Sequence, residues 1–213
     1  MSGPTLTVMN IAILTFEGFN ELDSLIALGL LNRIRRPDWT VSIASPTTRV
    51  RSMNGLVIEA HIGLEEANTA DAVLVGSGVR TRELAADPAL LAQIRLDPAR
   101  QVIGAQCSGT LLLAKLGLLG DVPACTDLTT KPWVQEAGVE VLNQPFFAAD
   151  NVATAGGCLS SAYLAAWAMV RLEGLSAATE ALHYVAPVGE KDDYVDRALA
   201  NITPYLPQQR ASA

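Results

Sequence analysis

The stretch Gln101-Val-Ile-Gly-Ala-Gln-Cys-Ser-Gly-Thr110 decides the fold. An apolar run ends at a single cysteine, Cys107, and a leucine-rich segment begins directly after it. The pattern predicts a buried strand over residues 101–105, a sharp corner at Cys107 and a helix over residues 108–119. Such a corner exposes its side chain at the carboxyl edge of a parallel sheet, where open α/β sheets carry their sites. We therefore expect Cys107 to be the centre of a functional site.

Apolar strands alternate with helical segments along the rest of the chain. This alternation predicts an α/β fold, doubly wound, with a mostly parallel sheet and helices on both faces. Because the chain has 213 residues and is 50% apolar, we expect a single domain over residues 1–213, with residues 1–8 as a loose extension. Strands are expected at 8–14, 39–44, 56–60, 71–75, 101–105, 139–142 and 146–153, and helices near 22–30, 82–96, 108–119, 159–172, 176–185 and 192–202.

Composition excludes several classes of protein. The net charge is −7, whereas a nucleic-acid surface needs clustered lysine and arginine. The most apolar late stretch, residues 159–170, is shorter than the ~20 residues of a membrane span, and the start of the chain lacks the basic residues of a signal peptide. Three cysteines and two histidines without a CxxC pair predict neither a disulfide framework nor a zinc site. We expect a cytoplasmic protein with no metal, no cofactor, no nucleic acid and no membrane partner.

The position of Cys107 favours a reactive thiol. A cysteine at a helix N-terminus faces unpaired N–H groups and the positive end of the helix dipole, which lower its pKa. The same N–H groups can stabilise a developing anion. Cys125 and Cys158 have no comparable context, and we expect both to be packing residues.

A proton-transferring partner for this thiol is harder to find. His61 and His183 do not neighbour a strand-end loop, so we expect structural roles for both. Three acids, Glu17, Glu21 and Asp23, follow the first strand at the same edge of the sheet. The residues alone do not choose among them, because an acid at a helix start is often a cap.

A second loop, Gly76-Ser77-Gly78, follows another buried strand. It is expected at the same edge of the sheet, where its glycines allow the backbone to approach a ligand closely. The loop lacks the third glycine of a dinucleotide-binding fingerprint, so it does not indicate such a cofactor.

Taken together, these segments resemble the ThiJ/PfpI superfamily and, within it, the isonitrile hydratases. The resemblance rests on a Leu-Asp pair at the end of the first loop, a strand ending in a glycine-rich triplet and the cysteine corner before leucines, and it spans roughly Asn10 to Tyr184. The segments that carry it are 11–23, 71–78, 84–88, 105–110, 117–119 and 151–157.

The resemblance implies a flavodoxin-like homodimer that acts on a small molecule. By analogy, the Cys107 thiolate would attack an isonitrile carbon, and Asp23, which follows Leu22 as in the family motif, would be the general acid/base. Ser108 keeps the hydroxyl that follows the cysteine in those enzymes. The backbone N–H groups of Gly78 and Ser108 would be the oxyanion donors, and the product an N-substituted formamide.

The sequence also departs from the family pattern. The Pro-Gly-Gly triplet reads Gly76-Ser77-Gly78, and Asp127 stands where many members carry a histidine. Asp127 could tune the site, bind a polar substrate or act as a cap. Two alternatives therefore stay open, namely another cysteine-dependent enzyme of glyoxalase type and a non-catalytic ligand or redox sensor.

Overall fold

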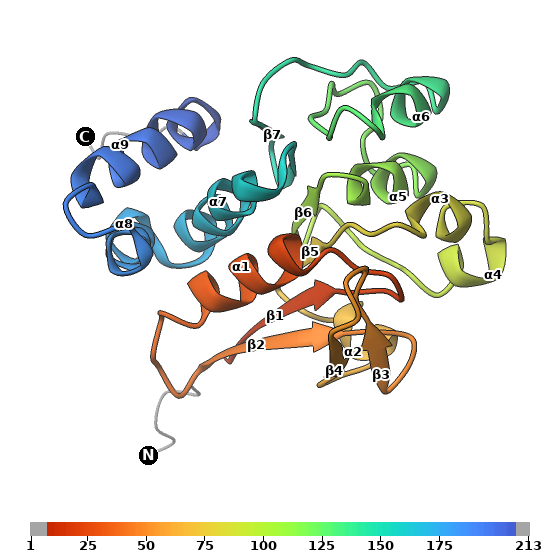
Figure 1. Cartoon of the computed structure of the whole chain (residues 1–213), viewed down its shortest axis with the longest axis horizontal. Coiled ribbons are helices and arrows are strands. Elements are labelled where there is room, and N and C mark those ends of the chain that lie inside the picture. The colour runs from red at the N-terminus through yellow and green to blue at the C-terminus, as the bar shows by residue number, and fades with distance from the viewer. Residues whose placement is uncertain (1–7, 208–213) are drawn as a thin grey trace.

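A six-stranded sheet forms the centre of the molecule, and the computed structural model describes residues 8–207 (Figure 1). The strand order is β2-β1-β5-β6-β8-β7, and all neighbours are parallel except the β7–β8 pair. The bounds are β1 (Met9–Leu14), β2 (Trp39–Ala44), β5 (Ala72–Val75), β6 (Val102–Gln106), β7 (Phe146–Ala149) and β8 (Val152–Ala155). A separate antiparallel pair consists of β3 (Arg49–Arg51) and β4 (Val57–Glu59).

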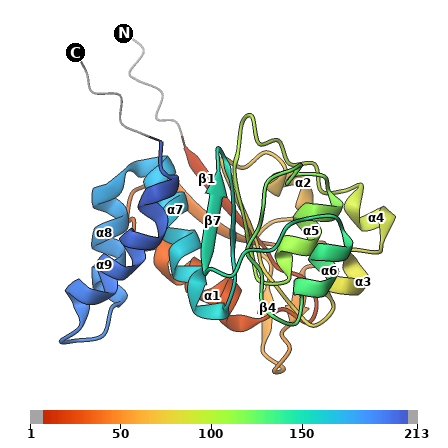
Figure 2. The ribbon, with the colours of Figure 1, turned by 90° about the horizontal axis from the view of Figure 1, so that it is seen from above.

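Helices cover both faces of the sheet, as Figure 2 shows. One face carries α1 (Glu21–Leu31), α7 (Ser161–Glu173), α8 (Leu175–Val185) and α9 (Lys191–Ile202). The other carries α2 (Leu64–Ala67), α3 (Thr81–Leu84), α4 (Pro88–Leu91), α5 (Gly109–Lys115) and α6 (Lys131–Glu136). The 3-10 turns η1 (Cys158–Ser160) and η2 (Thr203–Tyr205) precede α7 and follow α9.

The core consists of two apolar clusters, one on each face of the sheet. Successive β1 residues alternate between them, because Ile11 and Ile13 pack toward α1 and α7 whereas Ala12 and Leu14 pack toward α2 and α5. A strand that is buried on both faces has a continuous apolar sequence, and this explains why the apolar run at β1 predicted a strand. The mostly parallel, doubly wound α/β fold is therefore confirmed.

Several expected elements differ from the structure. The helix expected over 82–96 is two short helices, α3 and α4, because Asp87 caps a new helix that begins at Pro88. The strand expected at 139–142 is only an isolated bridge between Ala124 and Val141. The single strand expected over 146–153 is the β7–β8 hairpin, which turns at Asp150 with a φ of 51°. The helix expected to reach residue 119 ends at Lys115.

Other elements were not expected, namely β3, α2 and α6, which are three to six residues long and leave little periodic signal. Apart from Val8, the predicted N-terminal extension lies outside the described residues. Among the helices of residues 8–207, none is long and apolar enough to cross a membrane.

The loops after β1, β5 and β6 meet at the carboxyl edge of the sheet. The first two are joined by hydrogen bonds, from Asn20 N to Ser77 O at 2.9 Å and from Val79 N to Gly18 O at 2.9 Å. Their contact is so close that a Cβ added at Gly78 would lie 2.5 Å from Gly18 O. A glycine is therefore needed at this point, where the loop after β1 packs against the loop after β5.

Candidate functional site

Cys107 lies on a strained corner between β6 and α5. Its φ is 47°, a left-handed conformation that non-glycine residues seldom adopt. The surrounding backbone holds this conformation, since Cys107 N donates to Ala155 O at 2.8 Å and Thr126 Oγ1 donates to Cys107 O at 2.7 Å. The corner packs tightly against β5, where a Cβ on Gly109 would lie 2.6 Å from Val75 O. The nucleophile-elbow geometry predicted for Cys107 is present.

The start of α1 carries Asp23 into the same region. Asn20 caps the helix by accepting from Leu22 N at 3.1 Å, and Asp23, in the first turn, is only 2% exposed. Its Oδ2 accepts a hydrogen bond from the Ser77 hydroxyl. Its Oδ1 is buried and has no hydrogen-bond partner among the described residues. Asp23 therefore keeps one carboxylate oxygen available inside the site.

Cys158 completes a cluster with these two residues. The Sγ atoms of Cys107 and Cys158 and a carboxylate oxygen of Asp23 all lie within 4.8 Å of one another. Asn20 Nδ2 donates to Cys158 Sγ at 3.2 Å. The structure thus places Cys158 beside Cys107 and Asp23, a position that the sequence did not predict. One signal was available, because Cys158 follows a strand whose carboxyl end lies at the same sheet edge as Cys107.

The thiol is less acidic than its helix-terminal position suggests. Burial raises the pKa of Cys107, and the charge of Asp23 raises it further. Burial also raises the pKa of Asp23, against the hydrogen bond from Ser77. The lowered thiol pKa expected from the helix dipole is therefore wrong. Because two neighbouring anions repel, ionisation of either group opposes ionisation of the other.

Ser108 connects the elbow to the loop after β5. Its Oγ accepts from Gly78 N at 3.1 Å and is hydrogen-bonded to Thr81 Oγ1 at 2.8 Å. The Ser108 side chain is buried, with only 6% of the residue exposed. The Gly78 N–H is therefore already engaged by this hydroxyl, whereas the Ser108 N–H stands at the start of α5.

Asp127 borders the site at a greater distance. Its Oδ1 accepts from Thr129 N and Thr130 N, both at 2.9 Å, which is a capping arrangement. Its charge also raises the pKa of Cys107, more weakly than burial and Asp23 do. Asp127 lines a cavity of about 440 Å³ together with Thr126, Leu128, Lys131, residues 141–145, Gly156 and Gly157. This cavity adjoins the elbow, because Thr126 and Gly157 bond directly to residues 107 and 106.

The other candidates lie outside the cluster. The Glu21 carboxylate binds Ser52 and Asn54, and Glu17 accepts from the backbone of Arg51. The remaining candidates have surroundings typical of structural residues. His61 Nδ1 accepts from Ile43 N at 3.0 Å, Cys125 is fully buried, and His183 lies on α8 in the helical layer. Of the three acids after β1, the structure brings Asp23 to the thiol.

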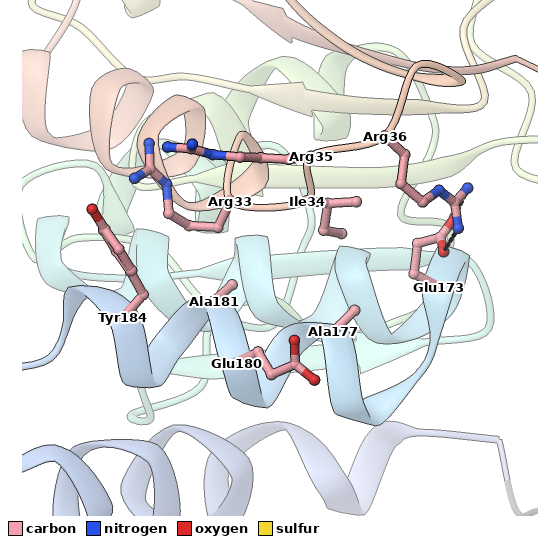
Figure 3. A pocket seen from close by; sticks show the side chains of 9 residues that line it. All are labelled: Arg33, Ile34, Arg35, Arg36, Glu173, Ala177, Glu180, Ala181 and Tyr184. Carbon is pink, nitrogen blue, oxygen red and sulfur yellow. Dashed lines mark hydrogen bonds and ion pairs between the residues drawn. The ribbon is translucent and has the colours of Figure 1, made fainter.

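A larger cavity, of about 620 Å³, lies away from this cluster between the end of α1 and α8 (Figure 3). Two of its charged side chains, Arg36 and Glu173, form an ion pair with each other. Arg36 bonds to Asp38 and Glu173, and the Arg33 guanidinium lies 4.8 Å from the centre of the Tyr184 ring. It contains no nucleophile of the kind found at the elbow.

A strand–cysteine–helix elbow beside a buried acid, on a doubly wound sheet, defines the class of α/β proteins with a nucleophile elbow. The model of the DJ-1/PfpI family matches residues 9–169. The chain belongs to this family. The match includes Asp23, Cys107 and Cys158. A search of curated proteins finds no match.

Solved structures share the fold at low sequence identity. A ThiJ/PfpI family protein from Pseudomonas syringae aligns with a TM-score of 0.75 and 18% identity, over 93% of this chain and 87% of that one. Oxidised DJ-1 from Toxoplasma gondii gives 0.70 and 18%, over 84% and 98%. An AraC family transcriptional regulator from Pseudomonas putida gives 0.70 and 19%, over 84% and 100%.

Proposed function

We propose that the protein hydrates an organic isonitrile to an N-substituted formamide. The observation that carries this proposal is the pairing of a buried acid with a thiol on an elbow. A carboxylate oxygen of Asp23 lies within 4.8 Å of the Cys107 sulfur, and the Oδ1 atom of this carboxylate is buried without a hydrogen-bond partner among the described residues. The resemblance of the Leu-Asp and cysteine segments to isonitrile hydratases, within the family to which the chain belongs, supports the choice of substrate.

The first step would use one proton of the Cys107–Asp23 pair. The Cys107 sulfur adds to the terminal carbon of R–N≡C, and Asp23 delivers the proton to that carbon. The product of this step is the thioimidate R–N=CH–S–Cys107. One proton held between two groups suits a reaction that needs a thiolate and an acid at the same moment.

Water would then complete the hydration. Asp23, now a carboxylate, accepts a proton from water as the hydroxide adds to the thioimidate carbon, and passes that proton to the nitrogen; the hydroxyl proton of the adduct is the one that returns to the thiol. Collapse of the tetrahedral adduct breaks the C–S bond and gives R–NH–CHO with the thiol restored. The overall reaction converts R–NC and H₂O to R–NH–CHO, with no other reactant. The Ser108 N–H would stabilise the developing charge, and the Gly78 N–H could join once the Ser108 hydroxyl moves away.

The substrate would occupy space next to the elbow. The 440 Å³ cavity beside Thr126 and Gly157 offers apolar contacts from Leu128, Val141 and Leu142, and one charge of each sign from Asp127 and Lys131. A cavity of this size suits a small organic molecule. We propose that Asp127 helps to set the polarity of this cavity and takes no part in proton transfer.

We also propose the homodimer and the cytoplasmic location that the sequence predicts. Leu22 of α1 and Leu159 of η1 are 49% and 74% exposed, and a second copy could cover them. Light scattering at micromolar concentration should give twice the chain mass, and a monomer would reject the dimer. A reducing compartment would keep Cys107 available as a thiol.

The decisive experiment mixes the purified protein with an aryl or alkyl isonitrile and follows formamide by mass spectrometry. Wild type and Cys125→Ala should form it. Cys107→Ala and Asp23→Asn should lose at least about 10²-fold in rate, the lower end for loss of an acid–base group.

No formamide above the buffer level would reject the proposal. Lactate from methylglyoxal would then favour a glyoxalase-type enzyme. If neither formamide nor lactate forms, the result would favour a sensor.

A further inference from the structure

We propose that Asp23, Cys107 and Cys158 form a binding site for one thiophilic metal ion of the Zn²⁺ class. Two sulfur atoms and one carboxylate oxygen lie within 4.8 Å of one another, although they come from three separate segments of the chain. The Asp23 Oδ1 atom is buried without a hydrogen-bond partner among residues 8–207, so an acceptor that needs a partner is present in the cluster. A cation would satisfy it.

Each of the three ligands is held by its own neighbour. The Ser77 hydroxyl donates to Asp23 Oδ2, which leaves Oδ1 free for a metal. Asn20 Nδ2 donates to Cys158 Sγ at 3.2 Å, and Gln106 Nε2 donates to Cys107 Sγ at 3.4 Å. Hydrogen bonds of this kind orient metal ligands and favour the thiolate form of a cysteine. Each of the three side chains is thus already oriented by a hydrogen bond from a neighbouring residue.

The donor set selects the kind of ion. Two thiolates with one carboxylate suit Zn²⁺ and other thiophilic ions, whereas Mg²⁺ and Ca²⁺ take oxygen ligands only. Zinc bonds of about 2.3 Å to sulfur and 2.0 Å to oxygen set ligand atoms about 3.5–3.8 Å apart in a tetrahedron. The present cluster therefore needs only small side-chain shifts to close on an ion. Three protein ligands leave the fourth position open to water or a small ligand.

Binding would exchange protons for the ion. Both thiols lose their protons when they become ligands, and Asp23 loses one as well wherever it is protonated. The affinity should therefore increase with pH. Because Cys107 would be a ligand, the bound ion would block its use as a nucleophile. The proposal does not depend on isonitrile hydration, since it concerns the same atoms in another chemical role.

The test uses the full chain, reduced with a phosphine and freed of metal by a chelator. Titration with Co²⁺ should give one equivalent of binding, with the near-ultraviolet band of thiolate-to-cobalt charge transfer and the visible bands of a tetrahedral ion. Zn²⁺ should displace Co²⁺ and remove both sets of bands. Cys125→Ser is the matched control, because its thiol lies outside the cluster, and it should behave as wild type.

The ligand variants decide the outcome. Cys158→Ser and Cys107→Ser should each lower the charge-transfer intensity and weaken Co²⁺ binding at least tenfold, and Asp23→Asn should weaken binding while keeping the thiolate band. If Cys107→Ser fails to fold, Cys158→Ser at its half-buried position gives the same comparison. Absence of the thiolate band in wild type would overturn the proposal. So would an unchanged band and affinity in Cys158→Ser. No isonitrile is present in these titrations, so their failure is separate from failure of the proposed enzyme activity.

Discussion

The Asp23 carboxylate and the Cys107 thiol occupy one buried environment at the carboxyl edge of the sheet. Burial is the main reason why the pKa of Cys107 is raised, and the charge of Asp23 is the second. The acid therefore opposes ionisation of the thiol that it would assist in a reaction. This opposition makes the charge state of each group depend on the other.

The first prediction concerns the acidity of the thiol. Asp23→Asn removes a negative charge beside Cys107, so the pKa of the thiol should fall. Labelling of Cys107 by iodoacetamide, followed by peptide mass spectrometry across pH, should then reach half its maximal rate at a lower pH. Asp127→Asn should shift the midpoint in the same direction by less, because Asp127 is a weaker cause. A midpoint in Asp23→Asn that stays constant or moves upward would contradict the prediction.

The second prediction concerns stability. The folded-state pKa of Asp23 is raised above 3.8, so folding favours its protonated form. This contribution is present below the unfolded pKa and is lost as the pH rises through the folded pKa. At pH 7 Asp23→Asn should therefore be more stable than wild type. Its Tm should be higher by about 2–4 °C for each kcal/mol gained in the free energy of unfolding.

The gain in Tm should shrink as the pH falls toward 4, which calorimetry over several pH values can follow. Equal or lower Tm values for the variant at pH 7 would show that the buried carboxylate does not destabilise the fold.

The third prediction concerns Ser108. Ser108→Ala leaves the Gly78 N–H and the Thr81 hydroxyl without this partner, which should lower the free energy of unfolding by about 1–3 kcal/mol. Ser108→Thr keeps a hydroxyl and should lose less. Urea unfolding measures both, and the exposed Ser176→Ala should stay within about 0.5 kcal/mol of wild type as a control. A Ser108→Ala variant as stable as that control would show that Ser108 does not stabilise the loop after β5.

The fourth prediction compares two glycines. Gly78→Ala would place a Cβ 2.5 Å from Gly18 O, so the two loops must separate, and we expect a loss of about 1–3 kcal/mol. In Gly29→Ala the new Cβ meets nothing within 4 Å inside α1, and a gain of up to about 1 kcal/mol is expected. Thermal unfolding of both variants gives the comparison. Equal effects of the two substitutions would mean that the loop contact does not constrain residue 78.

The sequence predicted the features that depend on local pattern. The buried strand before Cys107 and the apolar helix after it are consecutive in the chain, so the elbow could be recognised from one segment. The alternation of strands and helices led to the parallel sheet for the same reason. The boundary at Asp87-Pro88 was also present as a helix start signal, but one longer helix was predicted across it.

Features that depend on distant contacts were missed. The helix-dipole argument for an acidic thiol is local, whereas burial and the charge of Asp23, which reverse it, come from tertiary structure. Cys158 carries no motif, and the strand that precedes it was a weak signal until the structure placed β8 beside β6. The residues alone left Glu17, Glu21 and Asp23 equivalent. Only the family resemblance selected Asp23, the acid that the structure brings to the thiol.

The hydrogen bond from Asn20 to Cys158 spans 138 positions of the chain. Closing a loop of this length costs conformational entropy, so we expect this contact to form late in folding. The thiols of Cys107 and Cys158 should consequently stay open to a labelling reagent while the sheet assembles, and Cys107 should become protected only when the segments around Asn20 and Cys158 have docked. Pulsed alkylation during refolding would therefore use the protection of Cys107 to report when the fold is complete.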